Sequence, residues 1–282
     1  MEDFSSRRAE YMEYIANFCF FDDDFMRIAL DTIESVQLII RIIIERDDLE
    51  VTEIEAQYDV FSIDRHSVKL DIRAVDGEGK IYNIEIQRAR DGAAPKRARF
   101  NSSLIDADSL KKGDDYDKLP ETYVIFITET DVLGGKQPIY HADRIIRETG
   151  EEFDDKSHIV YVNGAIRDDT PLGRLMSDFA CTDAKDMHYG PLAERMRYYK
   201  ESEEGVASMC EAMEKLTAKA AAEGRAEGRA EGRAEGRAEG RAEGRVLAFV
   251  ELVKKGLLTL AQAAAELGMS VPEFEARAGL TA

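Results

Sequence analysis

Two neighbouring segments of alternating apolar and polar residues constrain the fold of this chain most strongly. Residues 67–75 read SVKLDIRAV and residues 80–87 read KIYNIEIQ. Alternation with a period of two is typical of a β-strand that lays one face on a core. The intervening Asp-Gly-Glu-Gly at residues 76–79 has the composition of a hairpin turn. The sequence therefore predicts an antiparallel hairpin.

The predicted hairpin carries one acid in each strand, both among apolar residues. A turn at residues 76–79 pairs residue 71 with the middle of the second strand, so Asp71 and Glu85 are expected to be cross-strand neighbours. Glu85 and Gln87 are two residues apart and therefore share a face. Two carboxylates this close repel unless a cation lies between them. Mg²⁺ and Mn²⁺ prefer oxygen ligands of this kind.

This arrangement indicates metal-assisted chemistry on a phosphodiester. An ion held by Asp71, Glu85 and the backbone carbonyl of Ile86 would polarise the phosphorus centre and lower the pKa of a bound water. The Gln87 amide can orient that water or hold a phosphate oxygen, and Glu34, on a predicted helix, is a further candidate ligand. The alternative interpretation is that these acids form the solvent face of a half-exposed hairpin, because such spacings are common by chance.

The rest of the first 215 residues alternates predicted helices with strands. Apolar residues at helical spacing after Asp22 predict a helix over residues 23–46. The other expected elements are a helix over 95–111 that begins near a proline, strands at 121–128 and 158–163, and helices at 172–179 and 187–215. This order predicts an α/β fold with a mixed sheet.

Residues 222–245 are six tandem copies of Ala-Glu-Gly-Arg. Glycine at every fourth position costs about 1 kcal/mol each in a helix, and no Glu has an Arg three or four residues away to form the usual helical ion pair. Ala, Glu and Arg nevertheless favour a helix, and rows of Gly and Ala would let two helices pack closely. We expect a marginal helix that becomes firm on self-association; an open linker is the alternative.

The last segment, residues 246–282, has the signals of three short helices, including a capping-box arrangement at Ser270 and Glu273. It resembles a helix-turn-helix in its order of elements. Its second and third helices carry one basic residue, Arg277, which favours a packing or assembly module over a DNA-reading one. The expected domains are therefore residues 1–215, a repeat connector at 216–245 and a small helical module at 246–282.

The charge of the chain, −19 at pH 7, is unusual for a protein that holds phosphates. Basic residues do cluster between residues 87 and 112. This segment contains seven Lys and Arg and three acids, which gives it a local charge of +4. Among them, Arg88, Arg97 and Arg99 are the candidate phosphate contacts. A solvated helix face is the alternative interpretation of this cluster.

The three cysteines are widely scattered, which argues against a disulfide framework and a thiolate zinc site. No apolar run approaches the roughly 18 residues of a membrane span, and the N-terminus has no apolar signal core. We therefore expect a soluble, cytoplasmic protein without a membrane partner.

Three blocks in order, FDDDFMRIALDTIESVQLIIRIIIERDDLEV, SVKLDIRAVDGEGKIYNIEIQ and KRARFNSSLIDADSLKKGDDY, resemble the PD-(D/E)XK nuclease family of transposases, the recombination-promoting nucleases. The resemblance covers about residues 20–215. It implies a restriction-endonuclease-like core, a mixed central sheet flanked by helices, here followed by a helical C-terminal tail. It also implies that Asp71, Glu85 and Gln87 cleave DNA with Mg²⁺ or Mn²⁺, with Glu34 at the position of the acid on the first helix.

Gln87 stands where the superfamily name has a lysine. The resulting hypothesis is a metal-dependent DNA endonuclease, linked to recombination or transposition. We expect a homodimer or higher oligomer, because cleavage of both strands needs two sites. The alternative is a catalytically inactive member of the fold that binds nucleic acid or serves as an oligomerising interaction module.

Overall fold

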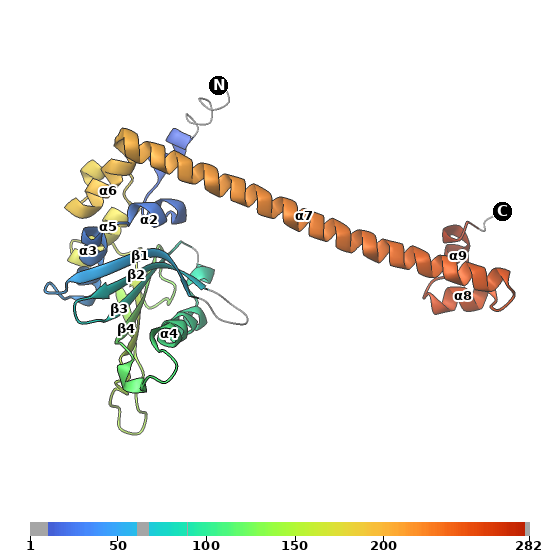
Figure 1. Cartoon of the computed structure of the whole chain (residues 1–282), viewed down its shortest axis with the longest axis horizontal. Coiled ribbons are helices and arrows are strands. Elements are labelled where there is room, and N and C mark those ends of the chain that lie inside the picture. Colours follow the sequence, from blue (N-terminus) through green and yellow to red (C-terminus); the bar gives the residue numbers. More distant parts are fainter. Residues whose placement is uncertain (1–10, 61–67, 89, 280–282) are drawn as a thin grey trace. The chain divides into compact units, whose positions relative to one another are not determined.

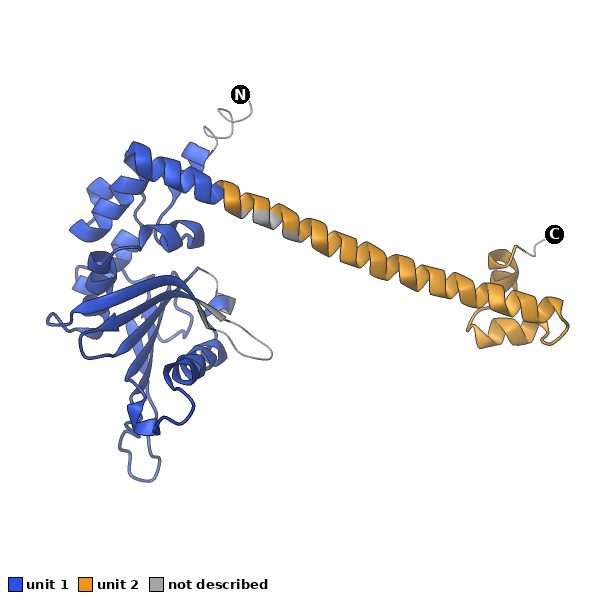
Figure 2. Ribbon diagram, viewed as in Figure 1, with its two compact units in different colours: residues 1–213 blue, residues 214–282 orange. Residues whose placement is uncertain are grey.

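The computed structural model describes residues 11–60, 68–88 and 90–279 (Figure 1). The chain divides into two compact units, residues 1–213 and residues 214–282 (Figure 2). Unit 1 contains all the strands described, and the described part of unit 2 is helical. The expected boundaries at residues 215 and 245 stay a prediction.

Unit 1 is built on one six-stranded mixed sheet with the strand order β1-β2-β3-β4-β6-β5. The strands are β1 (Val51–Val60), β2 (Val68–Asp76), β3 (Ile81–Gln87), β4 (Thr122–Thr128), β5 (Ile139–Ala142) and β6 (Ser157–Asn163). The strands β3, β4 and β6 are parallel to one another, whereas β1–β2, β2–β3 and β5–β6 are antiparallel pairs. The predicted α/β fold with a mixed sheet is confirmed.

The turn between β2 and β3 is held by the side chain of Asp76. Its carboxylate accepts hydrogen bonds from the backbone N–H groups of Glu78 and Lys80, both at 2.9 Å, and from the Tyr82 hydroxyl at 2.8 Å. Gly79 has a φ of +82°, a conformation that glycine adopts without strain. The composition of the turn thus sets the hairpin and, through it, the register of β2 against β3.

Helices cover both faces of the sheet (Figure 1). One face packs on α2 (Asp23–Ala29), α3 (Ile33–Ile44), α5 (Pro171–Ala180) and α6 (Gly190–Glu201), and the other on α4 (Pro95–Ser109). Short 3₁₀ turns lie at Arg90–Ala93, Tyr116–Lys118 and Ala184–Asp186. Ile84 and Ile125 point into the first core, while Val124 and Phe126 point into the second. Successive side chains along the strands therefore point into two separate hydrophobic cores, one on each face of the sheet.

The prediction of one helix over residues 23–46 is wrong, because the structure has two, α2 and α3, separated at residues 30–32. Thr32 begins the second helix, and its side chain accepts a hydrogen bond from the Ser35 N–H. Both helices bury apolar residues in the same core, so the apolar spacing continues across the break and hides it. The sequence analysis also did not predict β5.

The repeats belong to a continuous helix, α7 (Glu203–Lys254), which begins in unit 1, continues through unit 2 and ends before Gly256, whose φ is +72°. Two short helices follow, α8 (Leu260–Glu266) and α9 (Val271–Arg277). Thr259 and Gln262 form a capping box at α8, and the Ser270 side chain caps α9. The end of α7 packs with them on a small core that includes Val246, Val250 and Phe274. Within the described residues, no helix is long and apolar enough to cross a membrane.

Candidate active site

The register of β2 against β3 brings Asp71 to Glu85. The last recorded pair of this ladder is Ile72 with Ile84, and one further step along both strands places Asp71 opposite Glu85. At that step the Asp71 carboxylate takes the place of a backbone partner, because its Oδ2 accepts the Ile86 N–H at 3.3 Å. The predicted cross-strand neighbourhood of the two acids is thus what the register gives.

Asp71 is almost wholly buried, with 3% of its surface exposed. Its Oδ1 lies 3.4 Å from the Arg27 guanidinium of α2, which also pairs with Asp23 at 3.1 Å. Burial raises the pKa of the Asp71 carboxyl, the Arg27 charge opposes that rise, and the Asp23 charge adds to it. The Asp71 carboxyl is therefore poorly hydrated, and loss of its proton is unfavourable unless a positive charge lies nearby. These are the electrostatic conditions of a cation-binding site.

Glu85 is fully buried and is held from two sides. Its Oε2 accepts from Arg97 of α4 at 2.9 Å, and its Oε1 accepts from the Asn83 amide at 3.2 Å. The pKa of Glu85 is raised to about 7, mainly by burial and next by the Asp71 charge, while Arg97, Asn83 and the Asp71 backbone N–H act in the opposite direction. The influence of Asp71 means that the two carboxyl groups are close enough to interact.

Gln87 ends β3 on the same face as Glu85 and packs against the 3₁₀ turn that follows. A Cβ built on Gly92 would lie 2.0 Å from the Gln87 Oε1. The Gly92 carbonyl in turn accepts a hydrogen bond from Arg97 at 2.9 Å. A glycine is therefore needed at position 92 for the amide of Gln87 to pack against this turn, whose backbone also binds Arg97.

The fourth predicted ligand, Glu34, belongs to α3. It is exposed in the first turn of α3, and no contact between Glu34 and Asp71 or Glu85 is recorded in the described part of the chain. Asp23, on α2, is the helix acid whose charge reaches Asp71. The sequence analysis missed Asp23 and Arg27, although their spacing of four residues on one helix face was a usable signal.

The three predicted phosphate contacts differ in their surroundings. Arg88 is half exposed and pairs with Asp22 at 3.1 Å and with Glu129 at 3.5 Å. Arg97 is engaged with Glu85, whereas Arg99 is exposed on α4 and has no recorded ion pair among the described residues. Arg99 is thus the most available of the three for an external anion.

The donor set suits a hard divalent cation. Asp71 and Glu85 supply carboxylate oxygens, and Ile86 supplies a carbonyl at the strand edge that faces β2, because the N–H and C=O of one strand residue leave the same edge. The described residues hold no group of three or more His, Cys, Asp or Glu side chains able to bind a metal. Mg²⁺ is commonly bound by one or two carboxylates together with waters and substrate phosphates, so two carboxylates fit it.

Residues 39–164 match the family model described as "PD-(D/E)XK nuclease family transposase". The matched segment contains β2 and β3 with Asp71, Glu85 and Gln87, and it leaves out α2 and unit 2. No curated protein and no solved structure matches the chain.

Proposed function

We propose that this chain, whose residues 39–164 match the model of the PD-(D/E)XK nuclease family transposases, is a DNA endonuclease that depends on Mg²⁺ or Mn²⁺. One observation carries the proposal beyond the family. The carboxyl groups of Asp71 and Glu85 are buried on adjacent strands, and the charge of Asp71 raises the pKa of Glu85. Burying two acids side by side destabilises a fold, and a structural role would not require it.

In this proposal Asp71, Glu85 and the Ile86 carbonyl hold the cation. When bound, the ion polarises the phosphodiester and lowers the pKa of a water at the site. Arg27 fixes the orientation of Asp71 through its hydrogen bond at 3.4 Å. Asn83 fixes one oxygen of Glu85, which leaves Asn83 as a positioning residue. The Gln87 amide, beside Gly92, orients the attacking water or the scissile phosphate.

Gln87 carries no charge, so the positive charge that a lysine would bring must come from elsewhere. Arg97 meets that need, because its guanidinium bridges Glu85 and the Gly92 carbonyl at 2.9 Å each. Its 37% exposed side chain reaches both the buried acid and the surface. We therefore assign to Arg97 the stabilisation of negative charge as it develops on the phosphate.

The exposed basic side chains of α4 and of the loop before it would bind the DNA backbone. Lys96 and Arg99 are exposed on the same helix as Arg97, and Arg88 is available if it releases its acidic partners. These basic side chains give a locally positive surface to a chain whose overall charge is −19. A role in recombination or transposition in the cytoplasm, and a homo-oligomer with two active sites, complete the proposal.

Cleavage of supercoiled plasmid tests the proposal. Purified protein is expected to nick or linearise the plasmid with Mg²⁺ or Mn²⁺ and to be inactive in excess chelator. The variants Asp71→Asn and Glu85→Gln should lose this activity, whereas Glu53→Gln, an exposed acid on β1, should retain it. Plasmid binding without cleavage in every metal would refute the enzyme and favour the inactive, DNA-binding alternative.

A further inference from the structure

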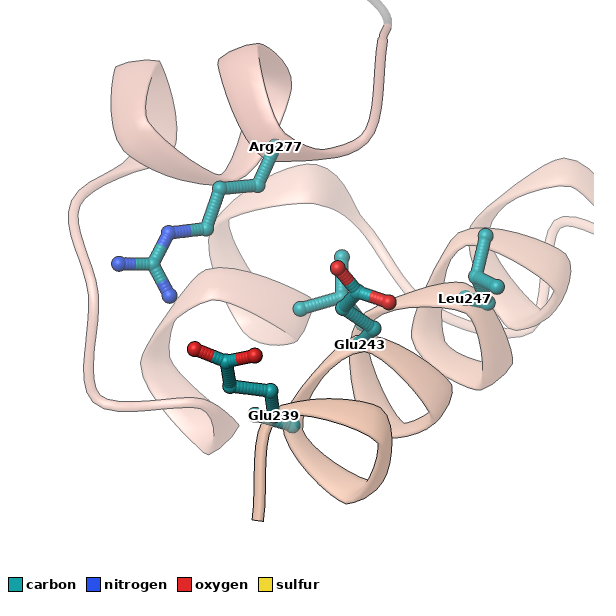
Figure 3. Close-up of a pocket in the computed structure, with 6 residues that line it drawn as sticks. Glu239, Glu243, Leu247 and Arg277 are labelled. Carbon is teal, nitrogen blue, oxygen red and sulfur yellow. The ribbon is translucent and has the colours of Figure 1, made fainter. Parts of the chain in front are cut away.

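Polar side chains line spaces of this chain both at its surface and in its interior. At the end of α7, a cavity of about 650 Å³ is lined by Glu239, Glu243 and Arg277, which are all exposed (Figure 3). Bulk water can hydrate these side chains, so their charges do not indicate a bound group. A buried polar atom differs, because folding removes its hydration and only a hydrogen bond replaces it. The described part of the chain has four buried residues with such unpartnered atoms.

The four residues lie on one side of the sheet, beneath α4. They are Asn83 on β3, Asn101 on α4, Thr122 on β4 and Tyr161 on β6, and none is more than 3% exposed. The three strand residues point to the face of Glu85, on which Ala98 and Ile105 of α4 also pack. Figure 1 shows α4 on this side of the sheet. The space between the sheet and α4 therefore contains polar atoms for which the described residues offer no partner.

Asn101 faces Asn83 because of how α4 returns across the sheet. The helix joins the parallel strands β3 and β4, so it runs back along β3. Its first turn is tied to β3 by the hydrogen bond of 2.9 Å between Arg97 and Glu85. From there Asn101 lies one turn, about 6 Å, along the helix, and Asn83 lies two residues, about 7 Å, back along the strand. The two asparagines therefore lie opposite each other.

A second contact of α4 supports this placement. The Oγ atoms of Ser102 and Ser157 are 2.8 Å apart. The register of the parallel strands sets Ser157, at the start of β6, level with Ile81. Asn101 lies between this contact and the first one, and Asn83 lies between the same two levels of β3.

The unpartnered atoms of the two asparagines are complementary. The Asn83 amide donates to Glu85 Oε1 at 3.2 Å, and its Oδ1, an acceptor, has no partner among the described residues. The Asn101 Nδ2, a donor, and the Asn101 Oδ1 have none there either. One water can accept from Asn101 and donate to Asn83. The unpartnered hydroxyl groups of Thr122 and Tyr161 border the same space, and a buried water typically makes about three hydrogen bonds.

We propose that a buried water joins Asn101 to Asn83, and that Asn101 thereby acts as a positioning residue for Glu85. An amide whose oxygen is held cannot turn its nitrogen away, so the water keeps the Asn83 donor on the Glu85 Oε1. The other oxygen, Oε2, accepts from Arg97. One side of α4 thus fixes both oxygens of the carboxylate, through Arg97 directly and through Asn101 by way of the water and Asn83. The catalytic consequence rests on the proposed nuclease function, whereas the hydrogen-bond link does not.

Nuclear magnetic resonance of the metal-free full chain tests the link without any cleavage. Asn83→Ala and Asn101→Ala identify the side-chain amide signals by their loss. In the wild type, both amides are expected to show magnetisation transfer from a bound water. Asn101→Leu should remove that transfer at Asn83 and shift its amide signals, whereas Ser102→Ala, which breaks the other polar contact of α4, should change neither. Wild-type amides that contact no water, or Asn83 signals that Asn101→Leu leaves unchanged, would overturn the link.

Metal binding and catalysis test the positioning. Asn101→Leu is expected to raise the Kd for Mn²⁺, measured by calorimetry, by about tenfold. It should also lower kcat, while the KM for plasmid changes by less than about twofold. Asn101→Ser, which keeps a group able to bind the water, should lose less in both, and Ser102→Ala should resemble the wild type. Because Asn101 acts through Asn83, Asn101→Leu should add less than about twofold to the loss caused by Asn83→Ala.

The outcomes separate this proposal from the nuclease function. A wild type that cleaves no DNA would refute the proposed nuclease alone, because the amide signals and the Kd for Mn²⁺ are measured without cleavage. Losses from Asn83→Ala and Asn101→Leu that multiply, or an Asn101→Leu chain that binds Mn²⁺ as the wild type does, would overturn the positioning role. Should Asn101→Leu fail to fold, Asn101→Ser combined with Asn83→Ala decides by the same criterion.

Discussion

Glu and Arg come together in two parts of this molecule with opposite consequences. In unit 1 one pair, Glu85 and Arg97, joins a fully buried carboxylate to a partly exposed guanidinium at 2.9 Å. In unit 2 the repeat exposes five of each over residues 226–245. Charges interact strongly when water is excluded and weakly at the surface. A single buried pair can therefore shift the pKa of an acid, as Arg97 lowers that of Glu85, whereas the exposed charges of the repeat act only when many contribute together.

The two regions should differ most when one Glu in each is replaced by Gln. Glu85→Gln is expected to lower plasmid cleavage by about 1,000-fold or more, because a metal ligand is lost. It should also stabilise the fold. The pKa of Glu85 is raised from 4.5 to about 7, so the folded chain holds this proton more tightly than the unfolded chain. The free energy of unfolding of the wild type therefore falls as pH rises between these values.

At pH 8 the Glu85→Gln variant should gain roughly 1–3 kcal/mol in the free energy of unfolding, measured by urea denaturation. The matched variant Glu235→Gln in the repeat should change neither cleavage nor unfolding measurably. If Glu85→Gln destabilised the fold and kept its activity, Glu85 would be a structural residue and the contrast between the two regions would fail.

Arg97 should be the next most sensitive position. Arg97→Gln is expected to lower cleavage by about 100-fold, since it removes the charge assigned to the phosphate. It should also raise the pKa of Glu85, which Arg97 holds down, and so move the acidic limb of the pH–rate profile to higher pH. Adding Gln87→Lys to this variant should restore part of the activity. A double variant as inactive as Arg97→Gln alone would argue that Arg97 does more than supply charge.

The hairpin that carries these residues could be predicted because both of its strands are short-range patterns. Alternation fixed which side chains share a face, and the turn at residues 76–79 fixed the register that sets Asp71 near Glu85. The partners of the two acids could not be predicted in the same way. Arg27 and Arg97 belong to helices that pack on opposite faces of the sheet. Patterns in a single sequence do not specify how these helices pack against the strands.

The choice of Glu34 shows the same limit. Apolar residues run on through the break at residues 30–32, so the sequence predicted one helix and assigned its acid to the site. The capping role of Thr32 is what divides the segment, and it leaves Asp23, on the earlier helix, nearer to Asp71. A local polar contact thus overrides a long apolar pattern.

The same substitution, Gly to Ala, should have opposite effects in the two regions. At Gly92 a Cβ would lie 2.0 Å from the Gln87 amide oxygen, so Gly92→Ala must displace that side chain. Cleavage should fall by about tenfold while the fold is retained. At Gly228 a Cβ meets nothing within 4 Å, and Gly228→Ala should increase helix content, as circular dichroism would show. Equal activity of Gly92→Ala and wild type would remove the proposed role of Gln87.

Binding of Mg²⁺ should depend on pH through Glu85. Below pH 7 most of this carboxyl carries a proton, which the cation must displace, and above pH 7 it does not. The apparent affinity, measured by calorimetry, should rise by up to about tenfold per pH unit below 7 and then level off. Asp23→Asn should weaken the pH dependence only slightly, because Asp23 acts on Asp71 rather than on Glu85. Affinity that is constant between pH 5 and pH 8 would contradict this account.

Ionic strength should have the smallest effect, and it separates the two regions once more. Each repulsion between like charges four residues apart in the repeat is worth only a few tenths of a kcal/mol, so raising NaCl from about 0.05 to about 0.5 M should increase the helix content slightly by screening it, as circular dichroism would show. The buried pair at Glu85 should respond far less, and the Mg²⁺-free unfolding midpoint should move little. A helix content that salt leaves unchanged or lowers would mean that the like charges of the repeat do not repel one another measurably, because screening must weaken any repulsion between them.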